Sequence, residues 1–321
     1  MSAKKLSLHK KTTEKRELPE REERQLAPMM RALKAIHSVG TPDSMNPEDL
    51  AKQRAAQELL GRLAAPMIVL KKWEPFRLKG MAAAWVRPDW PHDKRRVILY
   101  CHGGGYTSGN LGYSRPLASK LTSATGWETL CFEYRLAPED PFPAAVDDAR
   151  RAWDYLMYLG YGARDVVVAG DSAGGNLALV LCHQLKQAGR QLPGRLVLMS
   201  PWTDMTASGL SYTQRAELDP TITMDYIRAV REVYAGGRDL TSPLLSPLFG
   251  DFSGFPPTLI QVGSNEILYS DSLRLQARMR EANVHCRLEE WSDMWHVFQM
   301  FPVRKAAQAM DSISEFLLQP Y

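Results

Sequence analysis

Cysteine is scarce in this sequence, and its four positions show no pairing pattern. No two cysteines form a C-x-x-C pair, and each lies in a segment with the pattern of a strand or a helix. We therefore expect small buried hydrophobic residues rather than a disulfide framework or a metal site. A chain of 321 residues can bury roughly 75% of its unfolded surface, so it needs neither for stability. The four residues are Cys101, Cys131, Cys182 and Cys286.

The sequence also lacks a strong excess of one charge and any long apolar run. Lys and Arg number 40 against 36 Asp and Glu, and the small excess is dispersed, which argues against a nucleic-acid-binding surface. No apolar run approaches the roughly 20 residues that cross a bilayer. The basic N-terminus is not followed by the apolar stretch of a secretory signal. We expect a cytoplasmic protein that binds neither nucleic acid nor membrane, with a homodimer kept open as its assembly.

What the sequence does contain is an alternation of strand-like and helix-like segments, without internal repeats. This alternation predicts an α/β fold, in which helices cover both faces of a mostly parallel sheet. The expected strands are 67–70, 81–86, 96–101, 129–133, 166–169, 195–200, 258–262 and 286–291. The expected helices are 111–124, 144–159, 176–182, 270–283 and a last one from about 303.

Two regions do not fit this alternation. Residues 1–24 are mostly polar, which predicts a disordered arm or a frayed helix, and two helices are expected at 26–36 and 50–63, before the first strand. The alternation of strands and helices is interrupted again between about 204 and 256, where only 225–234 has a helical pattern. An insertion of this length is usually a lid or a binding loop. We therefore expect residues 1–65 to be an N-terminal arm followed by cap helices, and residues 66–321 to be the catalytic domain, with a cap insertion at about 204–256.

The central motif is Gly170-Asp-Ser-Ala-Gly174, which follows the apolar run that begins at Val166 and precedes a helix. Gly-x-Ser-x-Gly between a strand and a helix predicts a nucleophile elbow, with Ser172 exposed on a strained turn. Side chains at the two glycines would collide with neighbouring backbone. The alternative, an ordinary connection between a strand and a helix, is disfavoured by this context.

A serine needs a base to take its proton and a third group to orient that base. Ligands bind at the carboxyl ends of parallel strands, and of the seven histidines only His102 and His296 directly follow a strand. We expect His296 to be the base. Glu266 follows strand 258–262 and is the expected acid, with Asp271 as the reserve.

The transition state also needs hydrogen-bond donors for its oxyanion. His102-Gly-Gly-Gly-Tyr106 follows strand 96–101, so backbone N–H groups of Gly103 and Gly104, or of Gly105, can act with that of Ala173. His102 is expected to hold this loop in place. A phosphate-binding loop is excluded because the Gly-Lys-Ser/Thr ending and the Gly-x-Gly-x-x-Gly pattern are both lacking.

Three motifs in this order resemble the bacterial hormone-sensitive-lipase-like esterases, from about residue 66 onward. They are His102-Gly-Gly-Gly, Tyr134-Arg-Leu-Ala-Pro-Glu139 with Phe142-Pro-Ala-Ala145, and Gly170-Asp-Ser-Ala-Gly-Gly175. The resemblance implies an eight-stranded α/β-hydrolase with a helical cap that hydrolyses short-chain carboxylic esters without a cofactor. It also implies that Arg135 and Glu139 form a buried charged network beneath the site. The acid in this family is usually aspartate, so Glu266 is a departure.

We expect Tyr106, Trp202 and Trp295, which adjoin the catalytic loops, to line the substrate pocket. Apolar surroundings favour a small, mainly hydrophobic ester as the substrate of a serine carboxylesterase. A lactone or amide hydrolase would use the same residues, and a non-catalytic ligand-binding protein on this fold is the alternative of another class.

Overall fold

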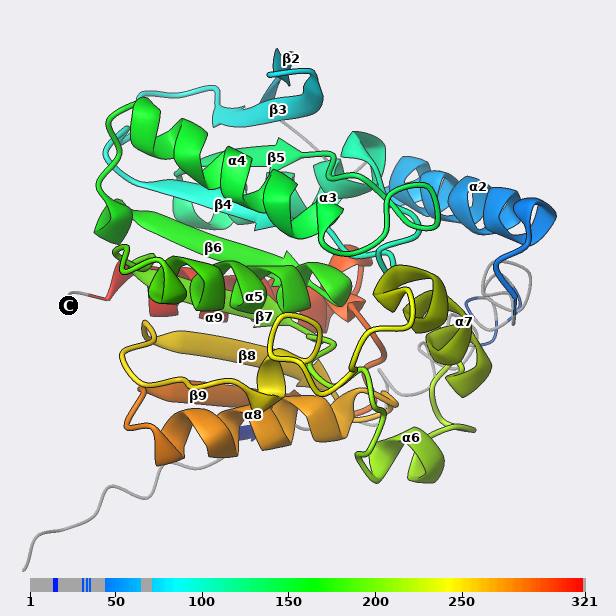
Figure 1. Ribbon diagram of the computed structural model, residues 1–321. Helices are drawn as coiled ribbons and strands as arrows, with labels where there is room; N and C mark the ends of the chain where they lie inside the picture. The colour runs from blue at the N-terminus through cyan, green and yellow to red at the C-terminus, as the bar shows by residue number, and fades with distance from the viewer. Residues whose placement is uncertain are drawn as a thin grey trace, which may run out of the picture.

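The computed structural model describes residues 14–16, 31, 33, 35, 44–64 and 71–319. A twisted sheet runs through the molecule in the order β1-β9-β8-β7-β6-β4-β5-β3-β2 (Figure 1). Neighbouring strands are parallel, except that β3 pairs antiparallel with both β2 and β5. The strands are β1 Glu14–Arg16, β2 Lys71–Leu78, β3 Met81–Pro88, β4 Val97–Cys101, β5 Glu128–Phe132, β6 Val166–Asp171, β7 Arg195–Met199, β8 Thr258–Gly263 and β9 Cys286–Trp291.

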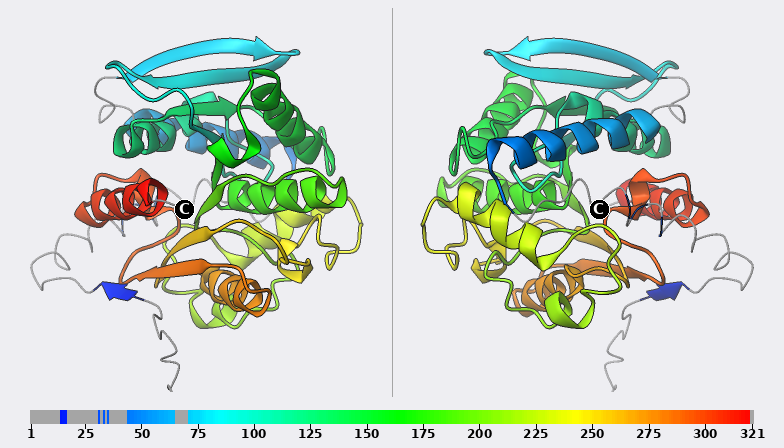
Figure 2. Two further views of the ribbon diagram at one scale, coloured as in Figure 1. Left: turned by 90° about the vertical axis from the view of Figure 1, so that its left-hand side faces the viewer. Right: turned by 90° about the vertical axis from the view of Figure 1, so that its right-hand side faces the viewer.

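Helices cover both faces of the sheet, as the alternation of elements predicts. Helices α4, α5 and α8 lie on one face, and α3 and α9 lie on the other (Figures 1 and 2). The α-helices are α2 Pro47–Ala64, α3 Leu111–Thr125, α4 Ala144–Tyr158, α5 Ala173–Gln187, α6 Ser211–Gln214, α7 Met224–Ala235, α8 Tyr269–Glu281 and α9 Arg304–Leu318. Short 3₁₀ helices are η2 Ala163–Asp165, η3 Pro247–Phe249 and η4 Phe298–Met300.

The central strands are mostly apolar on both faces because helices cover both faces of the sheet. In β6, Val166 and Val168 belong to the core under α4 and α5, whereas Val167 and Ala169 belong to the core under α3 and α9. All four side chains are buried, and burying a valine stabilises the fold by about 1.5–3 kcal/mol. The four cysteines are likewise buried and unpaired, as predicted.

Strands β2–β9 form the predicted eight-stranded, mostly parallel sheet, but the two edges of the sheet differ from expectation. The predicted strand 67–70 lies outside the described residues, and the edge strand is instead β2, which mixes Lys, Glu and Arg with aromatics. Charged side chains on an edge strand discourage pairing with other chains. At the other edge, Glu14–Arg16 pairs in parallel with β9 as a ninth strand, so this part of the N-terminal arm is neither disordered nor helical.

Three helices outside the alternation, α2, α6 and α7, lie near the carboxyl ends of the central strands (Figures 1 and 2). The Gln53 side chain connects α2 to the loop after β4 and to α7, because its amide donates to Thr107 Oγ1 at 3.0 Å and to the Tyr226 hydroxyl at 2.8 Å. The expected helix at 26–36 is described only at Arg31, Leu33 and Ala35, which are helical.

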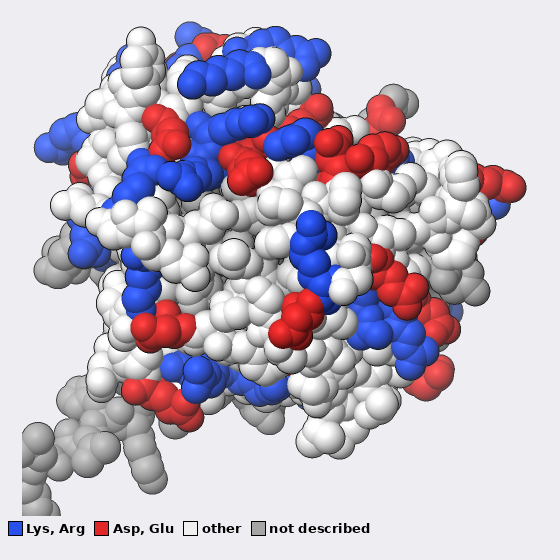
Figure 3. All heavy atoms as spheres, in the orientation of Figure 1, with Lys and Arg blue, Asp and Glu red and all other residues white. Residues whose placement is uncertain are grey.

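The surface gives no sign of a single dominant charge on the face in Figure 3, where Lys and Arg alternate with Asp and Glu. Within the part of the chain that the structure describes, no helix is both long and apolar enough to cross a membrane.

Candidate active site

The nucleophile motif folds as a sharp turn between β6 and α5. Ser172 has φ 53° and ψ −120°, a left-handed conformation that costs on the order of 1–3 kcal/mol for a residue with a side chain. A Cβ atom at Gly170 would lie 2.2 Å from the Gly174 carbonyl oxygen, and one at Gly174 would lie 2.0 Å from the Cys101 carbonyl oxygen. Both positions therefore require glycine, for the reason that the sequence suggested.

The strained serine is held by the next strand along the sheet. Its N–H donates to the Met199 carbonyl at 3.0 Å, and its carbonyl accepts the Trp202 N–H at 3.1 Å. Ser172 also precedes the first turn of α5, where free N–H groups favour negative charge.

His296 and Glu266 meet, although 30 residues separate them. Loops after β9 and β8 bring them together, with His296 Nδ1 at 3.1 Å from Glu266 Oε2. The other carboxylate oxygen, Oε1, accepts the Ser200 hydroxyl at 2.7 Å and the Gly263 N–H at 2.5 Å. One oxygen is thus fixed by the scaffold and the other orients the imidazole, which leaves Nε2 for proton transfer.

Within the described residues, Glu266 is the one hydrogen-bond partner of the His296 ring. Burial by itself lowers the pKa of His296, but the hydrogen bond and charge of Glu266, with the charges of Asp219 and Asp171, outweigh burial and raise that pKa above 6.5. An imidazole whose protonated form is stabilised in this way is suited to accept a proton.

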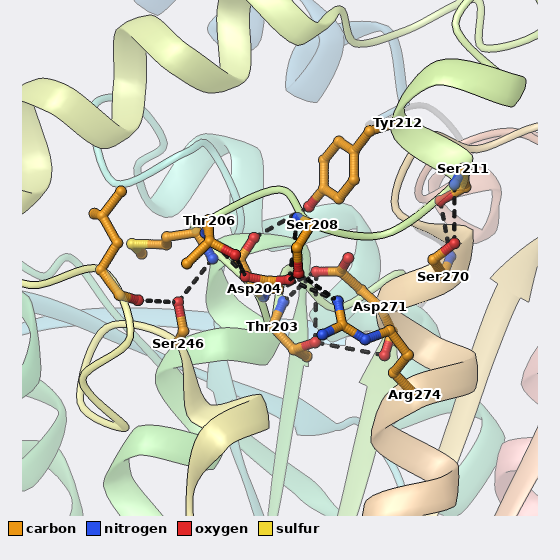
Figure 4. A network of polar contacts seen from close by, with 12 residues as sticks. Thr203, Asp204, Thr206, Ser208, Ser211, Tyr212, Ser246, Ser270, Asp271 and Arg274 are labelled. Atoms are coloured by element: carbon orange, nitrogen blue, oxygen red, sulfur yellow. Dashed lines mark hydrogen bonds and ion pairs between the residues drawn. The ribbon is translucent and has the colours of Figure 1, made fainter.

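Asp271, the reserve acid, binds backbone N–H groups after β7 and makes no hydrogen bond to His296. Its Oδ2 accepts the backbone N–H groups of Thr203 at 2.7 Å and Asp204 at 2.9 Å, in the network of Figure 4. Burial raises the pKa of Asp271 to about 7. Its contacts fix the chain after β7, where the long insertion begins, so the structure favours Glu266 over Asp271 as the partner of His296.

The glycine loop after β4 differs in one respect from expectation. The Gly103 N–H already donates to Asp171 Oδ1 at 3.0 Å, so Gly103 is not free to bind an oxyanion. Among the described residues, no hydrogen bond uses the N–H groups of Gly104, Gly105 or Ala173. Gly104 and Gly105 have positive φ values of 115° and 62°, which turn the chain in a way that favours glycine.

Asp171 is a site residue that the sequence reasoning missed. It is fully buried and accepts hydrogen bonds from the hydroxyls of Tyr100 at 2.5 Å and Tyr113 at 2.9 Å, as well as from Gly103. Burial raises its pKa, and the two tyrosine hydrogen bonds oppose that rise. Asp171 therefore ties the glycine loop to the residue before Ser172. A carboxylate at the end of an otherwise apolar strand was the signal that could have revealed it.

His102 has the predicted role of a scaffold. Its Nδ1 lies 2.7 Å from the Gly103 carbonyl oxygen, and its ring stacks on Tyr134 with centroids 4.1 Å apart. Burial lowers the pKa of His102 to about 4, so the ring is neutral at pH 7. The Tyr134 hydroxyl donates to the His102 carbonyl at 2.8 Å, which fixes the start of the loop.

The three aromatic residues expected in the substrate pocket are buried instead. Tyr106, Trp202 and Trp295 are exposed by 0%, 1% and 0%, so none offers surface to a substrate. The Tyr106 ring stacks on Tyr234 with centroids 3.8 Å apart, and its hydroxyl donates to Asn176 Oδ1 at 2.7 Å. These three aromatic residues lie next to the catalytic loops in the sequence, but that position did not predict whether their side chains are accessible to a substrate.

Arg135 and Glu139 also differ from the network implied by the resemblance. Arg135 binds the buried Asp148 through Nε at 2.9 Å, and Glu139 binds Arg54 of α2 at 2.7 Å. The side chains of Arg135 and Glu139 are exposed by 41% and 55%. The two residues therefore belong to separate groups of ion pairs: Arg135 also lies 3.8 Å from Asp140, whereas Glu139 ties α2 to the loop after β5.

The fold, with its elbow serine, its histidine–carboxylate pair and its glycine loop, is that of the α/β-hydrolase class. A family model described as alpha/beta hydrolase fold matches residues 98–300, more than half of the chain. The chain is 38% identical over 257 residues to an acetyl-hydrolase of Streptomyces hygroscopicus, covering 80% of this chain and 83% of that protein. It is 35% identical over 245 residues to an esterase of Acinetobacter venetianus, covering 75% and 80%.

Comparison with solved structures also finds esterases. An esterase from the bacterial hormone-sensitive lipase family superimposes with a TM-score of 0.83 at 35% identity, over 90% of this chain and 97% of that one. The chain therefore belongs to the α/β-hydrolase family and, within it, to the bacterial hormone-sensitive-lipase-like esterases. It is a serine hydrolase of carboxylic esters, as the sequence predicts.

Proposed function

We propose that Ser172, His296 and Glu266 are the catalytic triad of this esterase and that its substrates are small, mainly hydrophobic esters with short acyl chains. The observation that carries the assignment is the 3.1 Å contact between His296 Nδ1 and a Glu266 carboxylate that is itself fixed by Ser200 and Gly263. The 38% identity to a protein named acetyl-hydrolase supports a short acyl group.

In the proposed reaction, Ser172 Oγ attacks the ester carbonyl carbon while His296 Nε2 accepts the hydroxyl proton. Glu266 stabilises the imidazolium that forms. The tetrahedral intermediate places its oxyanion against the N–H groups of Gly104, Gly105 and Ala173, and each such donor is worth about 10²- to 10³-fold in rate. The imidazolium then protonates the departing alcohol, and water releases the acyl group from Ser172 with His296 again as the base.

The cap over this site is proposed to consist of the helical part of residues 1–65 and the insertion at about 204–256, with residues 66–321 as the catalytic domain. Glu14–Arg16 is not part of this cap, because it pairs with β9 at the edge of the sheet. The hydrogen bonds of Gln53 to Thr107 and Tyr226 support this division, because they join α2 and α7 above the glycine loop. A cytoplasmic location and a homodimer stay predictions, to be tested by cell fractionation and analytical ultracentrifugation.

Ser172→Ala tests the nucleophile. We expect hydrolysis of p-nitrophenyl acetate to fall to background, with an unchanged circular dichroism spectrum. Ser314→Ala is a matched control, because the Ser314 hydroxyl donates to Ala124 at the opposite end of the sheet, and it should keep wild-type activity. Wild-type-like turnover by Ser172→Ala would refute the assignment.

A second set of assays tests the two alternatives, a non-catalytic ligand-binding protein and a hydrolase of lactones or amides. A fluorophosphonate probe should label the wild type and not Ser172→Ala, whereas a ligand-binding protein without an activated serine should not react at all. A panel of p-nitrophenyl esters of increasing chain length, with lactones and anilides, then defines the substrate. Faster cleavage of lactones or anilides than of short esters would overturn the proposed substrate class.

A further inference from the structure

The segment that carries Glu266 is held from two sides. On the sheet side, Ser200 and Gly263 bind the Glu266 carboxylate. On the other side, the long insertion binds both backbone groups of Ile267, the next residue. Its N–H donates to Asp219 Oδ2 at 2.9 Å, and its carbonyl accepts the Ser211 hydroxyl at 2.5 Å.

Ser211 has a second pair of contacts in the same place. Its N–H donates to the Ser270 hydroxyl at 2.9 Å, and its own hydroxyl accepts the Ser270 N–H at 2.9 Å, as Figure 4 shows. The first turn of α6 is therefore attached to the first turn of α8, immediately after the Glu266 segment. A backbone held at consecutive polar groups has little freedom to move the carboxylate that it carries.

Of the two buried carboxylates in the insertion, Asp204 forms an ion pair with Arg274, whereas Asp219, which is 5% exposed, is bound by other groups. Its Oδ1 accepts the Thr221 N–H at 2.9 Å, the Thr221 hydroxyl at 2.6 Å and the Ile222 N–H at 3.2 Å. Within the described ranges no Lys or Arg forms an ion pair with Asp219. All of the hydrogen-bond donors to Asp219 are neutral N–H and O–H groups. The negative charge of ionised Asp219 therefore faces a cation only when His296 is protonated.

The titratable groups that act on Asp219 belong to the site. Burial raises the pKa of Asp219, the charge of His296 lowers it, and Glu266 raises it. The carboxylates that act on His296 come from three elements: Glu266 from the loop after β8, Asp219 from the insertion and Asp171 from the end of β6. Asp219 is thus a second carboxylate on the side of the catalytic acid, at a site where protonated His296 forms during the reaction.

We propose that Asp219 is a positioning residue of the catalytic centre: it fixes the Glu266 segment through Ile267 N–H, and its negative charge stabilises protonated His296 in the transition state. This inference rests on the proposed triad. It makes the insertion a structural part of the proton-transfer apparatus, so that the insertion does more than cover the substrate.

Asp219→Asn removes the charge and keeps the size of the side chain. We expect kcat for p-nitrophenyl acetate to fall by about 10- to 100-fold, because displacing a catalytic group by about 1 Å costs up to about 10²-fold. KM should change by less than about threefold, since Asp219 does not touch the substrate. Losing a nearby unit charge should also move the acid limb of kcat/KM to lower pH by roughly 0.5–1 unit.

Asp239→Asn is a closely matched control from the same insertion. Asp239 makes the same local turn, accepting the Thr241 N–H at 2.9 Å and the Thr241 hydroxyl at 2.8 Å, but it is exposed and contacts no site residue. This variant removes one charge and should leave both kcat and the pH profile unchanged.

Ser211→Ala separates the two parts of the proposal and covers the case in which Asp219→Asn does not fold. It removes the hydroxyl that binds the Ile267 carbonyl while leaving the Asp219 charge, so kcat should fall with no shift of the acid limb. Folded Asp219→Asn with a wild-type kcat and pH profile would overturn the inference, as would an equal shift in Asp239→Asn. In the same series, inactive Ser172→Ala and strongly impaired Glu266→Gln show that the nucleophile and the acid of the proposed triad stand, whichever result Asp219→Asn gives.

Discussion

Gly174→Ala places one methyl group where the nucleophile turn meets the glycine loop. The new Cβ would lie 2.0 Å from the Cys101 carbonyl oxygen and 2.5 Å from that of His102. Reaching an ordinary contact of 3.4 Å requires a separation of roughly 1.4 Å, the difference between 3.4 and 2.0 Å, and both contacts are backbone atoms of a close-packed strand end.

Two effects follow from that displacement. Overpacking of this kind costs about 1–3 kcal/mol of stability, which corresponds to a lower melting temperature by about 2–4 °C per kcal/mol. The displacement also moves Ser172 relative to the N–H groups of the glycine loop, and a shift of about 1 Å typically costs 10²-fold in rate. We therefore expect kcat/KM to fall by about 100-fold or more.

The assay is hydrolysis of p-nitrophenyl acetate, with thermal unfolding followed by circular dichroism. Gly189→Ala, after the other end of α5, is the control: it has φ 63° and no atom within 4 Å of a new Cβ. An alanine in that conformation costs about 1–2 kcal/mol, so stability falls while activity is kept. If Gly174→Ala retained kcat/KM within twofold of the wild type, the reasoning from this contact would be wrong.

Two further predictions concern the acid and the base. Glu266→Gln should lower kcat by about 10³- to 10⁴-fold, because an amide N–H turned toward Nδ1 selects the wrong tautomer of His296. Asp271→Asn should reduce thermal stability with little effect on kcat. If steady-state kinetics showed the larger loss of kcat for Asp271→Asn, Asp271 would be the catalytic acid. Because Glu266 and the nearby carboxylates raise the pKa of His296 above 6.5 and the base acts when neutral, kcat/KM should rise with pH through a midpoint above 6.5. A midpoint well below 6.5 in the pH profile would contradict this electrostatic account.

The parts of the site that could be predicted from sequence are those whose geometry is local. The tightness of the nucleophile turn is partly specified by its own residues, since Gly170 is required by a contact with Gly174 four positions later. Gly174 is required by Cys101 at the end of β4, a contact between distant segments that the strand–turn–helix context of the motif makes predictable. His296 and Glu266 were accessible to the same reasoning because each follows a strand, and the carboxyl ends of parallel strands share one edge of the sheet.

The parts that could not be predicted depend on tertiary packing. Tyr106 lies beside the catalytic loop, but its stacking partner Tyr234 comes from α7, more than a hundred positions away, and this packing removes it from the substrate. Asp219 lies in a stretch without periodicity, and only the folded insertion brings it to Ile267. The hydrogen bond that engages Gly103 required knowing where the Asp171 side chain points.

That hydrogen bond has a practical consequence for altering this enzyme. Residue 171 is adjacent to the nucleophile and at the same time holds the loop that receives the negative charge, so a mutation there changes two parts of the machinery together. Libraries designed to broaden the range of substrates should leave position 171 constant, along with Tyr100 and Tyr113 that support it, and place diversity in α2 and α7 instead.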